Sequence, residues 1–183
     1  LKHSTLQEYK YIHRSQKIDS YKQVCIIRNI FDLMVSVFYQ TIHKRRGRTF
    51  YTKYCEKNNL EISFESWVSC VADMPLLTDA NKPFEKNPRV LMTQSNHLIG
   101  CNDDCVLINF DNYDTELNDW LRKNLDKQLK PTKYDANALT KVYVDRPYPI
   151  DRPVDYRDLY TDSTISQVAD LFADELSIFE FTL

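Results

Sequence analysis

The sequence predicts an α/β fold in which helices flank a parallel sheet. Two short apolar runs, at 24–27 and 105–110, have the length and composition of strands, and each precedes a segment with helical spacing of apolar residues. A strand, a tight turn and a helix make one half of a βαβ unit. The chain has 183 residues, of which 43% are hydrophobic and 27% charged, and it contains no apolar run long enough to span a membrane. We therefore expect a single domain over 1–183 without a membrane segment.

The first third of the chain is expected to hold a helix, a strand and a second helix. Residues 4–14 favour a helix capped by Ser4 or Thr5. Four consecutive apolar residues at 24–27 predict a buried strand. Asn29 suits the N-cap of the following helix, and basic residues with a glycine near 44–47 suit its end. Its predicted apolar face is Phe31, Met34, Val35, Phe38 and Ile42.

Helices and a second strand are expected in the remaining chain. Two helices are predicted at 49–58 and 63–72, the second capped by Ser63. The run 105–110 predicts another buried strand, and 114–126 a helix with apolar residues on one face. Three prolines in 73–88 indicate a loop, and four in 130–160 indicate an irregular segment. Thr161 or Asp162 is expected to cap one final helix whose apolar face runs from Ile165 to Leu176.

Charge is distributed unevenly along the chain. The net charge is −2, but residues 1–60 hold twelve Lys and Arg against four acidic residues, and residues 61–183 hold twelve against twenty-two. A basic first third suits an anionic ligand, although a solvated surface with uneven charge gives the same pattern. The acidic remainder and the lack of a recognisable motif argue against a nucleic-acid partner.

Five cysteines are present without a CxxC pair. Cys101 and Cys105 lie four positions apart, and no second pair at zinc spacing accompanies them, so no metal site is predicted. Cys25 lies in an apolar run and is expected in the core. Free thiols in a reducing, cytoplasmic compartment are the favoured interpretation. A bridge between Cys101 and Cys105 is the alternative for a secreted protein.

The sequence also restricts how a phosphate can be bound. Its two glycines, Gly47 and Gly100, exclude a glycine-rich phosphate loop within the chain. Arg28 follows the first predicted strand, at the usual ligand edge of an α/β sheet, and its guanidinium can bind a phosphate bidentately. Ser36 lies eight residues later on the predicted helix and can donate to the same phosphate. The structural alternative pairs Arg28 with an acidic neighbour and packs Ser36 in the core.

Several segments, in order, resemble the sulfotransferases that use 3′-phosphoadenosine 5′-phosphosulfate, in particular the branch acting on carbohydrates. Cys25–Tyr39 is similar to their phosphate-binding strand and helix, with Ile30 in place of the usual proline. The stretch 2–5, Lys-His-Ser-Thr, is similar to one found upstream of that strand. The end of the chain, from Asp155-Tyr156-Arg157 to Phe181, is similar to the family's closing segment. Residues 108–113 take the place of a further family strand end, with Asn109 replacing an arginine.

This resemblance implies a P-loop nucleotide-kinase-like sulfotransferase fold and 3′-phosphoadenosine 5′-phosphosulfate as co-substrate, with no metal. It implies that Arg28 and Ser36 bind the 3′-phosphate. His3 becomes the candidate general base and Lys2 the candidate partner of the bridging oxygen, although both could simply be exposed. Tyr156 is implied near the adenine and Arg157 near a phosphate, a structural pair at a helix entry being the alternative.

The acceptor implied by the resemblance is a hydroxyl, of a carbohydrate in the branch named above, and a eukaryotic member of that branch would lie in the Golgi lumen. The family's loop around the 5′-phosphosulfate has no counterpart in the sequence, so we expect it upstream of Leu1. The alternative is a non-catalytic module of the same fold that binds an anionic glycan or nucleotide. The missing loop and a basic cluster favour that alternative; the cluster is Lys44, Arg45, Arg46 and Arg48.

Overall fold

The structure is a computed structural model that describes residues 22–42, 50–74, 93–98, 101–125 and 153–183. The helix expected at 4–14, the basic cluster at 44–48, most of the loop expected at 73–88 and most of the irregular segment expected at 130–160 lie outside these residues. Within them the chain has mixed helix and strand structure, so the coarse α/β prediction is confirmed. No helix in these ranges combines the length and the apolar character that crossing a membrane requires.

Two parallel strands form the sheet of the described chain. β1 (Val24–Ile27) pairs with β2 (Val106–Asn109) in a register that sets Val24 opposite Val106 and Ile27 opposite Asn109. The predicted strands and their parallel pairing are therefore confirmed.

Their predicted burial is wrong. Ile26 and Leu107 are 46% and 41% exposed, whereas Ile108 is 1% exposed. Among the described residues, the elements that pack on the two strands leave the side chains of Ile26 and Leu107 partly uncovered.

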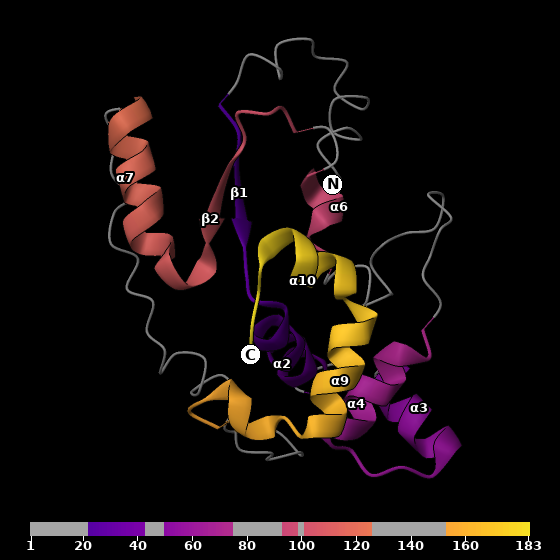
Figure 1. The fold of residues 1–183 in the computed structure, drawn as a ribbon. Helices are drawn as coiled ribbons and strands as arrows, with labels where there is room; N and C mark the ends of the chain where they lie inside the picture. Colours follow the sequence, from indigo (N-terminus) through magenta and orange to yellow (C-terminus); the bar gives the residue numbers. More distant parts are fainter. Residues whose placement is uncertain (1–21, 43–49, 75–92, 99–100, 126–152) are drawn as a thin grey trace.

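Helix α2 (Ile30–Ile42) leads directly from β1 into the core. The side chain of Asn29 accepts from the backbone N–H of Phe31 at 3.0 Å, and its carbonyl accepts from Leu33 at 2.9 Å, so Asn29 starts the helix as predicted. All five residues of the predicted apolar face are buried. Figure 1 shows α2 in the middle of the molecule, with the strand pair and α7 on one side and the other large helices around its far end.

An aromatic cluster joins α2 to α3 (Phe50–Asn58) and α4 (Phe64–Ala72). The ring of Phe38 lies 5.6 Å from Phe64, 6.2 Å from Tyr51 and 6.3 Å from Trp67, measured between centroids. Tyr51 and Trp67 are fully buried. The Tyr51 hydroxyl donates to the carbonyl of Ser63 at 2.6 Å, which satisfies its polar end inside the apolar cluster. Burial of these apolar rings stabilises the packing of α2 against α3 and α4.

Ser63 caps α4 as predicted, and replacing it with Ala should lower the free energy of unfolding by about 1 kcal/mol. Its hydroxyl accepts from the backbone of Ser66 at 3.1 Å, while the Ser66 hydroxyl accepts from the backbone of Ser63 at 3.1 Å. Chemical denaturation measures the loss. Ser177→Ala, at an exposed position of another helix, is the matched control and should stay within about 0.5 kcal/mol of the wild type. Equal stability of Ser63→Ala and the wild type would contradict the capping role.

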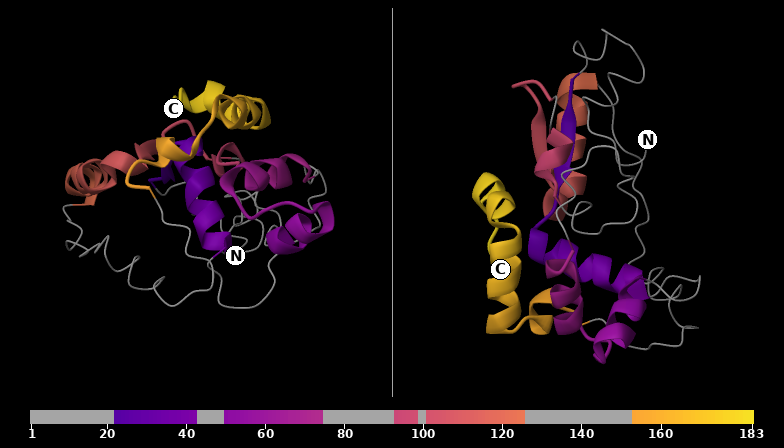
Figure 2. Two further views of the ribbon diagram at one scale, coloured as in Figure 1. Left: turned by 90° about the horizontal axis from the view of Figure 1, so that it is seen from below. Right: turned by 90° about the vertical axis from the view of Figure 1, so that its right-hand side faces the viewer.

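The C-terminal part of the chain supplies further helical elements. α7 (Tyr113–Leu125) contacts β2, the short 3₁₀ segment η4 (Tyr156–Leu159) contacts α2, α9 (Asp162–Leu171) contacts α4, and α10 (Ala173–Phe179) contacts α9. Figure 2 shows α9 and α10 as one column beside the other helices. Thr161 caps α9 as expected. The single final helix that the sequence predicts is wrong, because Phe172 adopts φ −126° and ψ 32° and breaks it in two.

Candidate functional site

Arg28 lies where both parallel strands end. It follows β1 directly, and Ile27 pairs with Asn109, so Phe110 leaves β2 at the same level. The Arg28 guanidinium lies over the Phe110 ring, 4.6 Å from its centroid. Phe110 opens the 3₁₀ segment η3 (Phe110–Asn112). A cation–π contact thus joins the two segments that follow the strands, at the edge where α/β sheets bind ligands.

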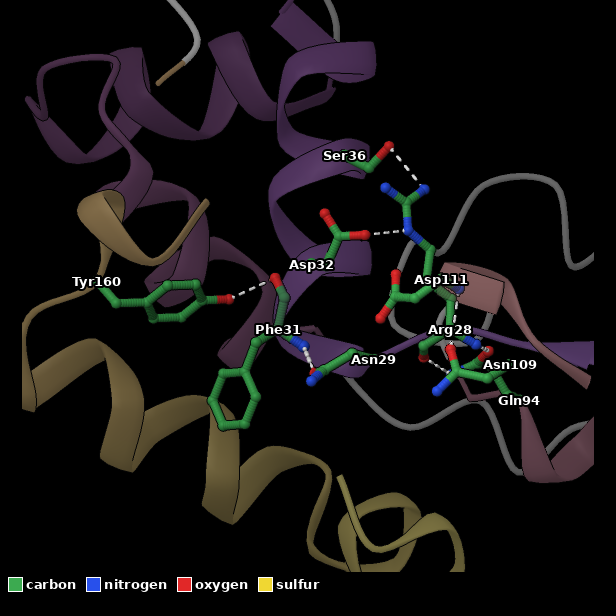
Figure 3. A network of polar contacts seen from close by, with 9 residues as sticks. All are labelled: Arg28, Asn29, Phe31, Asp32, Ser36, Gln94, Asn109, Asp111 and Tyr160. Atoms are coloured by element: carbon green, nitrogen blue, oxygen red, sulfur yellow. Dashed lines mark hydrogen bonds and ion pairs between the residues drawn. The ribbon is translucent and has the colours of Figure 1, made fainter. Parts of the chain in front are cut away.

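The guanidinium of Arg28 then runs along the face of α2. Its Nη1 donates to the Ser36 hydroxyl at 3.2 Å, and its Nε donates to the Asp32 carboxylate (Figure 3). The side chains of Arg28 and Asp32 are 21% and 13% exposed, so this pair is largely shielded from water. The acidic neighbour of the structural alternative is therefore present, and the contact between Arg28 and Ser36 leaves phosphate binding by the two side chains a prediction. Asp32 and Ser36 lie four positions apart on one face of α2, and the Arg28 side chain extends from the end of β1 along that face.

A buried carboxylate fixes the backbone at this point. Gln94 clamps Arg28 from both sides, since its Oε1 accepts from the Arg28 N–H and its Nε2 donates to the Arg28 carbonyl, both at 2.7 Å (Figure 3). Gln94 is held in turn by Glu175 of α10, whose carboxylate accepts from the Gln94 N–H at 2.9 Å and the Ser95 N–H at 3.0 Å. The Ser95 hydroxyl also donates to it, and Glu175 is 1% exposed.

Neither Gln94 nor Glu175 was among the site residues predicted from the sequence. One signal was present: Glu175 lies seven residues after Val168 and three after Phe172, on the apolar stripe of the C-terminal helices. An acid on an apolar stripe indicates a buried, hydrogen-bonded carboxylate. Gln94 follows the short proline-rich stretch and carried no comparable signal. It opens the short helix α6 (Ser95–Leu98).

Tyr160 holds η4 against the start of α2. Its hydroxyl donates to the Phe31 carbonyl at 2.8 Å, and its ring meets the edges of Phe31 and Phe64 at 5.4 and 4.8 Å. Burial raises the pKa of Tyr160, so the hydroxyl stays a neutral donor. This hydrogen bond holds the segment of Tyr156 and Arg157 against α2, the helix that also carries Ser36.

Tyr156 and Arg157 lie in η4, and Tyr156 is close enough to Asp32, the ion-pair partner of Arg28, to feel its charge. The Arg157 guanidinium lies over the Tyr156 ring at 4.9 Å and pairs with Asp155 at 3.3 Å. Burial raises the pKa of Tyr156, and the charges of Asp32 and Asp111 raise it further. The structure therefore brings η4 close to the Asp32 side of Arg28. The ion pair of Arg157 is with Asp155, and hydrogen bonds from Arg157 lower the pKa of that carboxyl group. Lys2 and His3 lie outside the described residues.

The structure also gathers three of the five cysteines. Cys25 was expected in the core, yet it is only partly buried, and its sulfur lies 3.9 Å from that of Cys101 and 3.8 Å from that of Cys105. The sequence pattern links Cys101 with Cys105 only, because nothing local connects them to a residue 76 positions earlier. None of the five cysteines is in a disulfide in the structure. Cys55 and Cys70 are buried away from this group.

No protein-family model, curated protein or solved structure matches this chain. The assignment of a function therefore depends on the residues themselves. Among those described, the arrangement with the clearest ligand chemistry is the Arg28–Ser36 pair at the carboxyl ends of the strands. A guanidinium and a hydroxyl that meet beside a helix N-terminus can share one phosphate or sulfate group.

Proposed function

We propose that this protein is a sulfotransferase that moves a sulfuryl group from 3′-phosphoadenosine 5′-phosphosulfate to a hydroxyl, in the first instance that of a carbohydrate. The hydrogen bond from Arg28 to Ser36, at the end of a parallel strand, carries the proposal. These two side chains are the ones that the resemblance assigns to the 3′-phosphate. The finer fold that belongs to the proposal is the P-loop nucleotide-kinase-like sulfotransferase fold.

The residues at this edge suit a phosphate in type and order. Arg28 supplies a planar fork, Ser36 a hydroxyl, and α2 the positive end of its dipole. Asp32 lies on the Nε side of the guanidinium, so it orients the fork while it lowers the positive charge of the site. A bound phosphate would compete with that carboxylate. The expected affinity is therefore below that of an unpaired arginine, and salt should weaken it.

Sulfuryl transfer makes further demands on the chain. The acceptor hydroxyl must lose its proton as its oxygen bonds to sulfur, and the bond from sulfur to the donor phosphate must break. The co-substrate supplies the activated sulfuryl group. In the proposal His3 takes the proton, as an imidazole can near neutral pH, and Lys2 neutralises charge on the departing oxygen. Tyr156 contributes a ring for the adenine, and Arg157 a second cation for the nucleotide.

The second candidate is a non-catalytic module that binds an anionic nucleotide or glycan at the same edge. One observation favours it: the described contact at this edge joins a guanidinium to a hydroxyl, an arrangement that suits anion binding. The two candidates differ in turnover. Transfer of labelled sulfate from the co-substrate to a panel of carbohydrate acceptors would support the enzyme, and nucleotide binding without transfer would support the module.

Calorimetric titration with 3′-phosphoadenosine 5′-phosphate tests the site itself. We expect saturable binding that Ser36→Ala weakens about fivefold, the equivalent of one hydrogen bond of about 1 kcal/mol. Ser177→Ala, an exposed serine on α10, should bind like the wild type. Equal affinity of Ser36→Ala and the wild type would contradict the assignment of Ser36 to the phosphate.

A further inference from the structure

Cys25, Cys101 and Cys105 form a compact group of thiols apart from the hydrogen bonds of Arg28. Their three sulfur atoms all lie within 4.8 Å of one another, and the two distances from Cys25 are 3.9 and 3.8 Å. All three residues are partly buried. Cys55 and Cys70, by contrast, are 2% and 1% exposed. The chain thus has three partly buried cysteines in one group and two fully buried ones elsewhere.

Backbone contacts bring these cysteines together. Cys25 lies in β1, and Cys105 directly precedes β2, whose first residue donates its N–H to the Gln23 carbonyl at 3.0 Å. A turn closed by a bond from the Cys105 N–H to the Asn102 carbonyl, at 3.0 Å, brings Cys101 back to the same place. The parallel pairing that aligns the strands therefore also fixes the three sulfurs. Such preorganisation lowers the cost of binding a metal ion.

The spacing of the sulfurs suits a tetrahedral metal–thiolate centre. A zinc–sulfur bond is about 2.3 Å long, and two sulfurs at a tetrahedral angle about one ion are then about 3.8 Å apart. The Cys25 distances match this value without movement of the chain. Thiolates prefer soft or borderline ions such as zinc. Three protein ligands leave a fourth position, which water takes in open zinc sites.

Two polar atoms beside the cysteines add an independent indication. Gln23 Nε2 and Asn102 Oδ1 are buried without a hydrogen-bond partner. The two side chains belong to the segments that carry Cys25 and Cys101, and they meet each other, since the Asn102 N–H donates to Gln23 Oε1 at 3.0 Å. Orphaned buried polar atoms are rare and accompany bound water or ions. A thiolate would accept from the amide donor, and a metal-bound water would donate to the amide oxygen.

We propose that Cys25, Cys101 and Cys105 bind one Zn²⁺ ion, with water in the fourth position. On binding, each thiol releases its proton to solvent and forms a bond from sulfur to zinc, without oxidation or reduction. The ion joins the start of β1 to the turn before β2. It therefore stabilises the strand pair whose opposite end carries Arg28. This site does not depend on the proposed function.

Zinc titration of the fully reduced chain, against a chromogenic chelator, tests the proposal. We expect one equivalent of Zn²⁺ per chain. Cys25→Ser or Cys105→Ser should weaken binding by more than the roughly 10- to 100-fold that loss of an outer-sphere partner costs. Cys70→Ala is the matched control, because this cysteine is buried elsewhere, and it should bind zinc like the wild type. Absence of zinc binding, or unchanged affinity in Cys25→Ser, overturns the proposal.

Alkylation of the unmutated protein gives a second test that does not require the variants to fold. Zinc should protect Cys25, Cys101 and Cys105 from iodoacetamide, as read by peptide mass spectrometry, and it should leave the modification of Cys55 and Cys70 unchanged. Equal modification of the three cysteines with and without zinc overturns the site. A disulfide between two of them, combined with no zinc binding after reduction, would assign the group to redox chemistry instead.

Discussion

Replacing Arg28 with Ala should weaken the binding of 3′-phosphoadenosine 5′-phosphate by about 100-fold or more. Hydrogen bonds to charged groups contribute about 1.5–3 kcal/mol each, and a guanidinium can make two to one phosphate. The change would also leave the Asp32 carboxylate without its cation, next to the place where the phosphate binds. Repulsion then adds to the lost attraction. Isothermal titration of the variant and the wild type at the same ionic strength measures the change.

Two further arginine variants separate recognition from general charge. Arg28→Lys keeps the positive charge but loses the planar fork and the bond from Nε, so it should bind with intermediate affinity. Arg122→Ala removes an exposed arginine of α7 that pairs with Asp119 at 2.8 Å, and it should bind like the wild type. Because Arg28 is also a structural partner of Asp32, the melting temperature of each variant is recorded first. A folded Arg28→Ala protein with wild-type affinity would remove Arg28 from the proposed site.

The local parts of this fold could be predicted from the sequence because their causes are local. Four apolar residues followed by Arg-Asn determine the end of β1 and the start of α2 within one residue. The cap at Ser63 follows in the same way, since its partner, Ser66, lies three positions away. The sequence predicted that Arg28 at the strand end and Ser36 on the following helix serve one phosphate, and the structure has the two side chains in contact at 3.2 Å. Short sequence separation is what makes such features predictable.

The parts that could not be predicted depend on residues distant in the chain. Glu175 meets Gln94 across 81 positions, and Cys25 meets Cys105 across 80. No spacing rule links such residues, since their meeting depends on how whole elements pack. The break at Phe172 belongs to the same class, because a continuous apolar stripe crosses it. The exposure of the strands likewise depends on how many neighbours each strand has, which a short apolar run does not reveal.

Replacing Glu175 with Ala should lower the free energy of unfolding by about 3 kcal/mol or more. The Glu175 carboxylate accepts from two backbone N–H groups and one hydroxyl, those of Gln94 and Ser95, in a buried site. Each buried donor left without an acceptor costs about 1–3 kcal/mol. Glu175→Gln keeps the size of the side chain but brings an NH₂ group to a site lined by donors, so it should destabilise as well. Denaturant titration gives the free energy of each variant.

The neighbouring residue on α10 supplies a control that separates this network from a general effect of charge. Asp174 is exposed, so Asp174→Ala removes the same charge from the same helix turn and should change stability by less than about 0.5 kcal/mol. Equal stability of Glu175→Ala and Asp174→Ala would contradict the network.

Gln94 connects Glu175 to the backbone of Arg28, through two hydrogen bonds of 2.7 Å. Glu175→Gln should therefore weaken the positioning of Arg28 as well. Under conditions where the variant remains folded, its affinity for 3′-phosphoadenosine 5′-phosphate should be lower than that of the wild type.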